Sequence, residues 1–228
     1  MLSTAVLVGW HGLKVDPAGA KIRPLRGSAN HSPKCELLLR IIFLMRKLSM
    51  EELNRKSVDE FKEAEKTPVI VVLENIRSAY NVGSVFRTAD AFLLEAIYIC
   101  GYTCTPPHKE IKKTALGAED SVHWKHFSNT VQAIEDLHAK GYKVFAVEQA
   151  QGSTLLHDTN WATGEKIAVI FGNEVTGVEQ ATIQQCEGCI EIPQLGMKHS
   201  LNIATAAGVV LWELVRKRIP QTAQIENQ

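Results

Sequence analysis

Polar residues that could bind a ligand or assist a reaction are concentrated in three short stretches of the sequence. The stretches are "ENIRSAYNVGSVFR" at 74–87, "FGNEVTGV" at 171–178 and "IPQLGMKHSLN" at 192–202. Each combines amide, carboxylate, hydroxyl or guanidinium groups with glycines, which let a backbone approach a ligand closely. This combination makes the three stretches candidates for a ligand-binding site.

Several of these residues also have ordinary structural explanations. Asn81 could cap a helix, Gly83 could give flexibility, and Arg87 could be a solvated charge. Ser200 could be the N-cap of the last helix. Asn202 is harder to explain, because Asn is a poor helix former and this one lies just inside an apolar helix. We therefore expect another group to hydrogen-bond to Asn202.

Five continuous apolar runs precede or separate these stretches, at 69–73, 96–100, 143–147, 167–171 and 189–192. Continuous runs are typical of strands buried on both faces. Helical spacing is found between and after the runs, and this alternation predicts an α/β fold with a mostly parallel sheet flanked by helices. Such sheets bind ligands at the carboxyl ends of their strands. The predicted helices cover 84–92, 130–140, 178–186 and 200–218.

The sequence also predicts four segments. Residues 1–44 form an irregular extension, residues 45–67 a helical extension, residues 68–219 the main domain, and residues 220–228 a polar tail that frays. Ser49 with Glu52 and Ser57 with Glu60 have capping-box spacing, so two short helices are expected before Pro68. Because Met45 begins the first regular pattern, residues 1–44 are interpreted as an upstream translation extension.

Composition excludes several classes of protein. The 228 residues carry 25 basic and 25 acidic side chains, so a nucleic-acid site must be a local patch. The apolar run "LLLRIIFLM" is broken by Arg40 and is shorter than the roughly 20 residues of a membrane span. No signal peptide is recognised, and the odd number of cysteines, five, argues against a disulfide framework. A cytoplasmic protein with no membrane partner is expected.

Known cofactor and metal motifs do not explain the sequence. It contains neither G-x-G-x-x-G nor a P-loop, which disfavours nicotinamide dinucleotides and nucleoside triphosphates. Cys186 and Cys189 form a C-x-x-C that could bind zinc or act in redox chemistry. Packing as small apolar side chains is the favoured interpretation. No metal is predicted.

In their order along the chain, "NxGxxxR", "GNExxG" and "IPQxGxxxSLN" resemble the three motifs of the SpoU/TrmH family of SPOUT RNA 2'-O-methyltransferases. The resemblance covers about residues 68–214, including "PPHKEIKKTALGAEDSVHW", and does not extend to residues 1–44. It implies an α/β fold with a C-terminal deep trefoil knot, S-adenosylmethionine as methyl donor, and a homodimer. The implied reaction is methylation of a ribose 2'-hydroxyl in RNA.

The resemblance also implies roles for individual residues. Arg87 matches the catalytic arginine, which the family contributes across the dimer interface, and its high pKa favours electrostatic activation over base catalysis. Asn81 matches the residue that positions this arginine, and Glu174 would orient the same network. Ser200 and Asn202 match residues of catalytic support. The implied cofactor-binding residues are Gly172, Asn173, Glu174, Ile192, Gln194, Leu201 and Asn202, and the apolar helix 201–215 is the expected dimer interface.

Basic residues at predicted strand ends could grip RNA phosphates. Lys109, Lys112 and Lys113 are expected in a loop with His108, and Arg77 and Lys198 lie in other loops. The compact chain slightly favours tRNA over rRNA as substrate. Two alternatives stay open: a catalytically silent knotted protein that binds RNA or assists assembly, and an unrelated cofactor enzyme on a similar sheet.

Overall fold

The computed structural model describes residues 13–15, 22–24, 47–49, 51–53 and 55–219. The chain divides into two compact units, Met1–Arg55 and Lys56–Gln228. In the first unit, β1 (Leu13–Val15) pairs antiparallel with β2 (Ile22–Pro24). This ladder lies in the segment 1–44, where no regular element was expected. The tail 220–228, expected to fray, lies outside the described residues.

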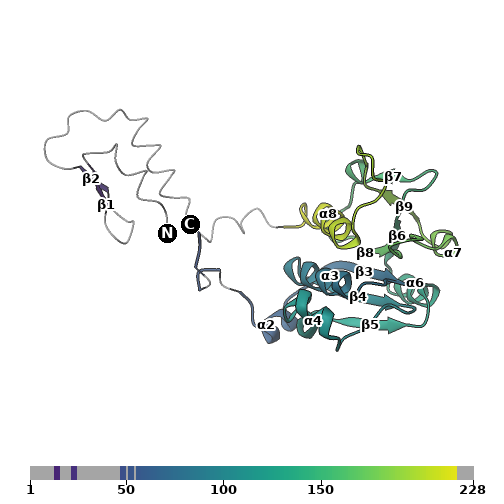
Figure 1. Cartoon of the computed structure of the whole chain (residues 1–228), viewed down its shortest axis with the longest axis horizontal. Coiled ribbons are helices and arrows are strands. Elements are labelled where there is room, and N and C mark those ends of the chain that lie inside the picture. Colours follow the sequence, from purple (N-terminus) through teal and green to yellow (C-terminus); the bar gives the residue numbers. More distant parts are fainter. Residues whose placement is uncertain (1–12, 16–21, 25–46, 50, 54, 220–228) are drawn as a thin grey trace. The chain divides into compact units, whose positions relative to one another are not determined.

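Seven parallel strands form the sheet of the second unit, in the spatial order β5, β4, β3, β8, β6, β9, β7 (Figure 1). All five predicted apolar runs fall in strands, except that Ile192 follows the end of its strand, and this confirms the predicted parallel sheet. β5 and β7 were missed, because β5 is an edge strand with two exposed residues and β7 has only two residues. The strands are β3 (Thr67–Glu74), β4 (Leu94–Cys100), β5 (Trp124–Phe127), β6 (Lys143–Val147), β7 (Thr154–Leu155), β8 (Ile167–Phe171) and β9 (Gly188–Glu191).

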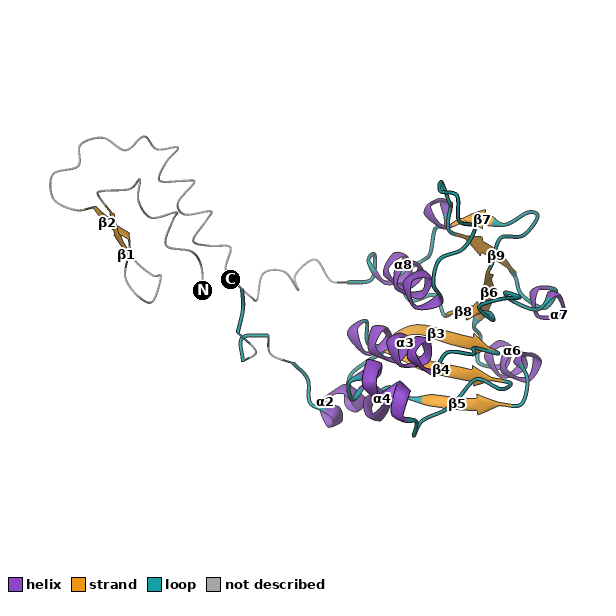
Figure 2. Cartoon of the chain, in the orientation of Figure 1, coloured by secondary structure: helices purple, strands orange, loops and turns teal. Residues whose placement is uncertain are grey.

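Helices cover both faces of this sheet (Figure 2). Alternate β3 residues enter two separate apolar cores, with Val71 and Leu73 in one and Ile70 and Val72 in the other. The first core is completed by α3 and α8, and the second by α6. This confirms that the continuous apolar runs reflect burial on both faces. The helices are α2 (Val58–Glu63), α3 (Ala79–Ala91), α4 (Lys109–Ala115), α5 (Ala118–Ser121), α6 (Thr130–Ala139), α7 (Gln180–Ile183) and α8 (Ile203–Val215), with a 3-10 turn, η2 (Leu156–Asp158).

The helix starts differ from the sequence predictions at two functional stretches. α3 begins at Ala79 and is capped by Ser78, so Asn81 lies in its first turn and is not the cap. α8 begins at Ile203 and is capped by Asn202, whose side-chain oxygen accepts from the N–H of Ala204 at 2.9 Å. The prediction that Ser200 caps this helix was therefore wrong. Ser200 is left free of a capping role and exposed.

Two further local predictions need correction. Lys109, Lys112 and Lys113 lie on α4 and not in a loop, because the His108 ring nitrogen accepts from the N–H of Glu110 and caps a helix there. The predicted capping box of Ser57 and Glu60 is confirmed at the start of α2. Ser49 and Glu52 exchange the same pair of hydrogen bonds, but residues 51–53 form a turn and not the expected helix.

Gly83 allows α3 and α4 to pack closely and is not a flexible hinge. A Cβ atom at this position would lie less than 3.0 Å from Thr114 Oγ1 and from the backbone oxygen of Ile111. Thr114 also donates its hydroxyl to the carbonyl of Tyr80 at 3.0 Å, at the same crossing. The missing side chain therefore sets the distance between the two helices.

We expect Gly83→Ala to lower the free energy of unfolding by about 1–3 kcal/mol, because the added methyl forces two packed backbones apart. Gly208→Ala in α8 is the matched control, since a Cβ there meets nothing within 4 Å. It should raise the free energy by about 0.5–1 kcal/mol through helix propensity. Urea unfolding measures both variants. Equal effects of the two substitutions would contradict the close-packing account.

Among the described residues, no helix is long and apolar enough to cross a membrane.

Candidate active site

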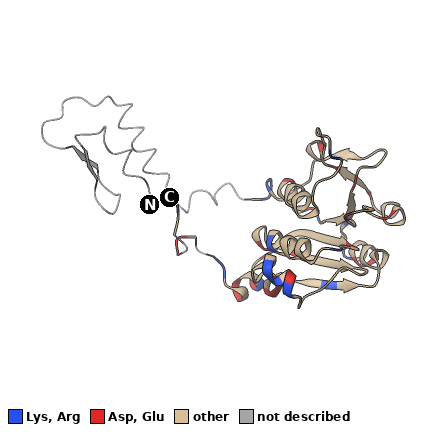
Figure 3. Ribbon diagram, viewed as in Figure 1, with Lys and Arg blue, Asp and Glu red and all other residues tan. Residues whose placement is uncertain are grey.

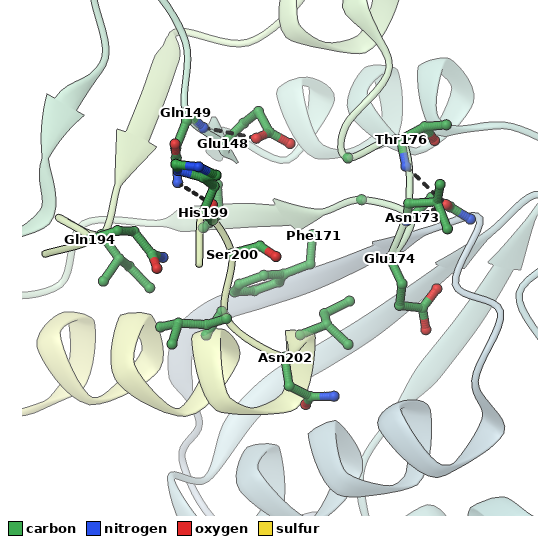
Figure 4. Close-up of a pocket in the computed structure, with 18 of the residues that line it drawn as sticks. Glu148, Gln149, Phe171, Asn173, Glu174, Thr176, Gln194, His199, Ser200 and Asn202 are labelled. Carbon is green, nitrogen blue, oxygen red and sulfur yellow. Dashed lines mark hydrogen bonds between the residues drawn. The ribbon is translucent and has the colours of Figure 1, made fainter. Parts of the chain in front are cut away.

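A cavity of about 470 Å³ opens at the carboxyl ends of β6, β8 and β9, beside the start of α8 (Figure 4). This is the edge of the sheet at which ligand binding was expected. Its lining mixes apolar side chains with amides, hydroxyls and carboxylates from three separate loops. The described lining residues are Val147, Glu148, Gln149, Phe171, Gly172, Asn173, Glu174, Val175, Thr176, Gly177, Ile190, Ile192, Gln194, His199, Ser200, Leu201, Asn202, Ile203 and Ala206.

The loop after β8 is folded tightly by its two glycines. Asn173 and Gly177 exchange two backbone hydrogen bonds, at 3.0 and 2.9 Å, which close the loop. Gly177 has a φ of 69°, in the left-handed region that favours glycine. A Cβ on Gly172 would lie less than 3.0 Å from the backbone of Gly177 and Val178. Both glycines are needed for this loop to have its observed shape.

Glu174 joins the loop after β8 to the start of α3. Its carboxylate accepts from the N–H groups of Arg77 and Ser78, at 2.9 and 3.0 Å, and from Asn81 Nδ2 at 2.9 Å. Partial desolvation raises the pKa of this carboxyl, but the donated hydrogen bonds outweigh it and hold the pKa below its ordinary value. Glu174 is therefore ionised at neutral pH.

The loop between β9 and α8, which contains the stretch 192–202, is joined to the same hydrogen-bond network through Asn202. Asn202 Nδ2 donates to Asn81 Oδ1 at 3.1 Å, while its oxygen caps α8. The expectation that another group hydrogen-bonds to Asn202 is confirmed. Glu174, Asn81 and Asn202 thus form one chain of hydrogen bonds that connects all three polar stretches at the mouth of the cavity.

We expect the hydrogen bonds that Glu174 accepts to stabilise the protein only at pH values at which its carboxyl is ionised. Because folding lowers its pKa from 4.5, the stabilisation is present above about pH 4.5 and is lost as the pH falls below it. The free energy of unfolding, measured with urea, should be higher for wild type than for Glu174→Gln at pH 7 and pH 5. This difference should become smaller at pH 4 and pH 3. Glu135→Gln on the exposed face of α6 controls for charge removal. A difference that stays constant down to pH 3 would contradict this prediction.

The predicted catalytic and cofactor-binding residues are only partly brought together. The seven predicted cofactor residues all line the cavity, and Ser200 lines it too. Arg87 is exposed on α3 and is not among the described residues that line the cavity. Arg77 and Lys198 are exposed on the loops that flank the cavity. A single chain therefore assembles the cavity without its predicted catalytic arginine.

Sequence reasoning missed a third contribution to the cavity, from Glu148 and Gln149 at the end of β6. Glu148 Oε2 accepts from the N–H of Val178 at 3.0 Å and lies where a Gly177 side chain would be. Gln149 Nε2 donates to the carbonyl of His199 at 2.7 Å. This pair therefore holds one loop on each side of the cavity. The two residues could have been identified from the sequence, because they directly follow the apolar run 143–147.

The C-x-x-C pair lies away from the cavity lining, in the second core. Burial raises the pKa of the Cys186 thiol to about 12, and its Sγ donates to the carbonyl of Thr182 at 3.3 Å. A thiol that stays protonated at neutral pH is a poor nucleophile, and packing explains this cysteine. In the part of the chain that the structure describes, no group of three or more His, Cys, Asp or Glu residues could hold a metal ion.

The fold and the cavity define an α/β protein with a cavity at the carboxyl ends of its parallel strands, where proteins of this class bind ligands. Within this class, the chain belongs to the SpoU rRNA methylase family, whose model matches residues 68–212. The resemblance seen in the three motifs is thereby confirmed, and so is the predicted α/β fold.

Two sequence relatives and one crystal structure illustrate this membership. The 23S rRNA (guanosine-2'-O-)-methyltransferase RlmB of Vibrio parahaemolyticus is 30% identical over 171 residues, which are 74% of this chain and 67% of the relative. The tRNA (guanosine(18)-2'-O)-methyltransferase of Thermus thermophilus is 29% identical over 169 residues, which are 74% of this chain and 84% of the relative.

The crystal structure is that of an AdoMet-bound rRNA methyltransferase from Sinorhizobium meliloti. It superposes with a TM-score of 0.64 at 26% identity and covers 70% of this chain. The present chain spans 61% of the length of that crystallised chain.

Proposed function

We propose that this protein transfers a methyl group from S-adenosylmethionine to a ribose 2'-hydroxyl of RNA. The observation that carries the proposal is the chain of hydrogen bonds from Glu174 through Asn81 to Asn202. It joins the three motif loops at the mouth of the cavity. The relatives named above are 2'-O-methyltransferases of rRNA and tRNA, which supports the same reaction here.

The cavity has the size and charge that S-adenosylmethionine requires. Its volume of about 470 Å³ falls within the range of small-molecule sites, roughly 300–1,000 Å³. Ile192 and Leu201 supply apolar surface for a flat base, while the folded loop at Gly172 presents backbone polar groups. The described lining contains two carboxylates, Glu148 and Glu174, and no Lys or Arg. This charge suits a cationic sulfonium and disfavours the phosphates of a nicotinamide dinucleotide.

When bound, S-adenosylmethionine supplies an electrophilic methyl group. The residues that would hold it are Gly172, Asn173, Glu174, Ile192, Gln194, Leu201 and Asn202, all of which line the cavity. The remaining task of the protein is to place the ribose hydroxyl in line with the methyl group and to stabilise the negative charge that develops on its oxygen.

In this proposal, Ser200 and Asn202 orient the ribose. Ser200 has an exposed hydroxyl at the cavity that is not used as a helix cap. Asn202 is fixed by its bonds to Asn81 and Ala204, so its amide has a defined direction. Arg87 would stabilise the developing oxyanion and the adjoining phosphate as a permanent positive charge. Its exposed position fits an arginine that reaches the cavity of a second copy.

A homodimer is therefore part of the proposal. α8 exposes Val209 and Trp212, at 41% and 50%, although most of its other apolar side chains are buried. An apolar helix face beside a site that lacks its arginine fits an interface that completes the site. We also propose that the segment between β9 and α8 passes through the loops after β6 and β8 as a deep trefoil knot. That arrangement would hold the cavity rigid.

A local basic patch would bind the RNA phosphates. Lys109, Lys112 and Lys113 lie on α4, whose ribbon is largely blue in Figure 3, where Lys and Arg are coloured blue. All three are exposed. The Lys113 ammonium lies 5.9 Å from the ring centroid of Tyr80 on α3. Arg77 and Lys198 would extend the patch toward the cavity. Such a patch compensates for the zero net charge of the chain.

Among RNA substrates we favour tRNA, because the chain is compact, and we expect the reaction to take place in the cytoplasm. Incubation of the protein with methyl-labelled S-adenosylmethionine and separate tRNA and rRNA pools, followed by nucleoside analysis, tests the proposal. Labelled 2'-O-methylnucleosides in one pool would establish the reaction and its substrate class. Cofactor binding with no label in either pool would favour the silent RNA-binding alternative. Transfer to free nucleosides would favour a small-molecule enzyme.

A further inference from the structure

Tyr102 is an exposed aromatic residue held firmly at the carboxyl end of β4. The residue as a whole is 64% exposed to solvent. Its hydroxyl oxygen nevertheless accepts from Asn173 Nδ2 at 2.7 Å, and its N–H donates to Asn75 Oδ1 at 3.3 Å. The ring is therefore fixed at both ends while it remains open to solvent.

The backbone around Tyr102 adopts unusual conformations that fix this position. Asn75 has a φ of 54°, which is rare for a residue other than glycine. Gly101 has a φ of 65°, and a Cβ on it would lie less than 3.0 Å from Asn75 Oδ1. The Asn75 side chain occupies this space, and its Nδ2 also donates to Glu179 Oε1 at 2.8 Å. Strained conformations of this kind tend to be kept at functional sites.

Tyr102 is connected to the cavity by a hydrogen bond and precedes the basic patch in the sequence. Asn173, its hydrogen-bond donor, lines the cavity and also donates to the carbonyl of Asn75 at 2.8 Å. In the other direction along the chain, the segment after Tyr102 leads to α4 with its three exposed lysines. Tyr102 therefore lies at the same edge of the sheet as the cavity, one hydrogen bond from a lining residue.

We propose that Tyr102 is a substrate-binding residue whose ring stacks on an unpaired RNA base next to the methylated nucleotide. The inference rests on the proposed function and adds to it the kind of RNA contact that is made. Single-stranded bases stack on exposed aromatic side chains, and a ring that is already immobilised loses little entropy on binding. The substrate would accordingly be an unpaired or splayed-out segment and not a continuous duplex.

Tyr102→Leu tests the inference, because it removes the aromatic ring and keeps an apolar side chain. We expect the KM for RNA and the Kd for RNA from fluorescence anisotropy to rise about 5- to 150-fold. The Kd for S-adenosylmethionine should change less than about twofold, and the melting temperature should fall by no more than about 4 °C, because one exposed hydrogen bond is lost. Tyr102→Phe keeps the ring and loses only the bond from Asn173, so it should bind RNA within about threefold of wild type.

A salt titration separates stacking from phosphate binding. The logarithm of the RNA association constant falls linearly with the logarithm of the salt concentration. Lys112→Ala should make this slope shallower by about one, because one phosphate contact is lost. Tyr102→Leu should weaken RNA binding without changing this slope. Unchanged RNA affinity in Tyr102→Leu would overturn the inference. So would an equal loss of cofactor affinity in the Leu and Phe variants, which would show that Tyr102 only supports Asn173.

These outcomes are distinct from failure of the proposed function. If wild type methylates RNA and Tyr102→Leu equals it, only the stacking inference fails. If wild type binds RNA through Tyr102 but transfers no methyl group, the inference stands and the enzymatic proposal fails. If wild type binds neither tRNA nor rRNA in the anisotropy measurement, both fail.

Discussion

Arg87→Ala should lower kcat for RNA methylation by about 10²- to 10³-fold and leave the affinity for S-adenosylmethionine unchanged. The guanidinium is the charged group proposed to stabilise the developing oxyanion, and it lies outside the cavity of its own chain. Steady-state kinetics and calorimetric titration of the cofactor measure the two quantities. Because Arg87 is exposed, its loss should not affect folding. A fall in cofactor affinity equal to the fall in kcat would contradict the assigned role.

Arg87→Lys is the conservative control, since it keeps the charge but cannot form a forked pair of hydrogen bonds. It should recover part of the lost rate if the charge itself matters, and little if two simultaneous contacts to ribose and phosphate are required. Either result keeps Arg87 at the reacting atoms. Full wild-type activity in Arg87→Ala would remove it from the mechanism.

A mixing experiment tests whether Arg87 acts across a dimer. Arg87→Ala chains are combined with Gly172→Ala chains, each of which should be nearly inactive alone. If the arginine serves the partner's cavity, a mixed dimer contains one intact site, and random exchange should restore about a quarter of wild-type activity. If Arg87 serves its own chain, no mixed dimer contains an intact site and activity stays at the level of the separate variants.

Gly172→Ala should weaken S-adenosylmethionine binding by about 100-fold or more. The added Cβ would lie less than 3.0 Å from the backbone atoms of Gly177 and Val178, which cannot rotate away as a flexible side chain would. The loop must therefore shift, and small displacements of binding groups carry losses of this order. Calorimetric titration of the cofactor measures the effect.

Gly188→Ala in β9 is the matched control, because its Cβ would meet only the Phe145 ring, at an ordinary contact distance of 3.8 Å. It should bind the cofactor like wild type. The global stability of both variants, measured by urea unfolding, separates a local change in the loop from unfolding. Cofactor affinity that is normal in Gly172→Ala would show that the loop after β8 does not shape the cofactor site.

The fold was predictable from sequence where burial leaves a strong pattern. β3, β4, β6, β8 and β9 could be predicted because their side chains are nearly all apolar. β7 has only two residues and depends on its pairing with β9, so nothing in its own sequence identifies it. The close packing at Gly83 was equally invisible, since a glycine near a helix start looks the same whether it bends the chain or admits a neighbouring helix.

The cavity was predictable in part, for a related reason. Gly172, Glu174 and Asn202 could be identified because their residue types are unusual beside apolar elements. Glu148 and Gln149 were missed because their importance comes from the spatial order of the strands, in which β6 lies between β8 and β9. Tyr102 follows the apolar run 96–100, but its role depends on bonds to Asn75 and Asn173, 27 and 71 residues away, which the sequence does not reveal.

The hydrogen bond between Asn81 and Asn202 spans 121 residues and has a consequence for biosynthesis. A chain emerging from the ribosome can form β3 and α3 early, but the cavity lacks one wall until the segment before α8 has been synthesised and has docked. Contacts of such long sequence separation form late in folding. A chain truncated after Phe171 would contain every strand of the sheet except β9 and would still lack Gly172, Asn173 and Asn202, which are proposed to bind the methyl donor.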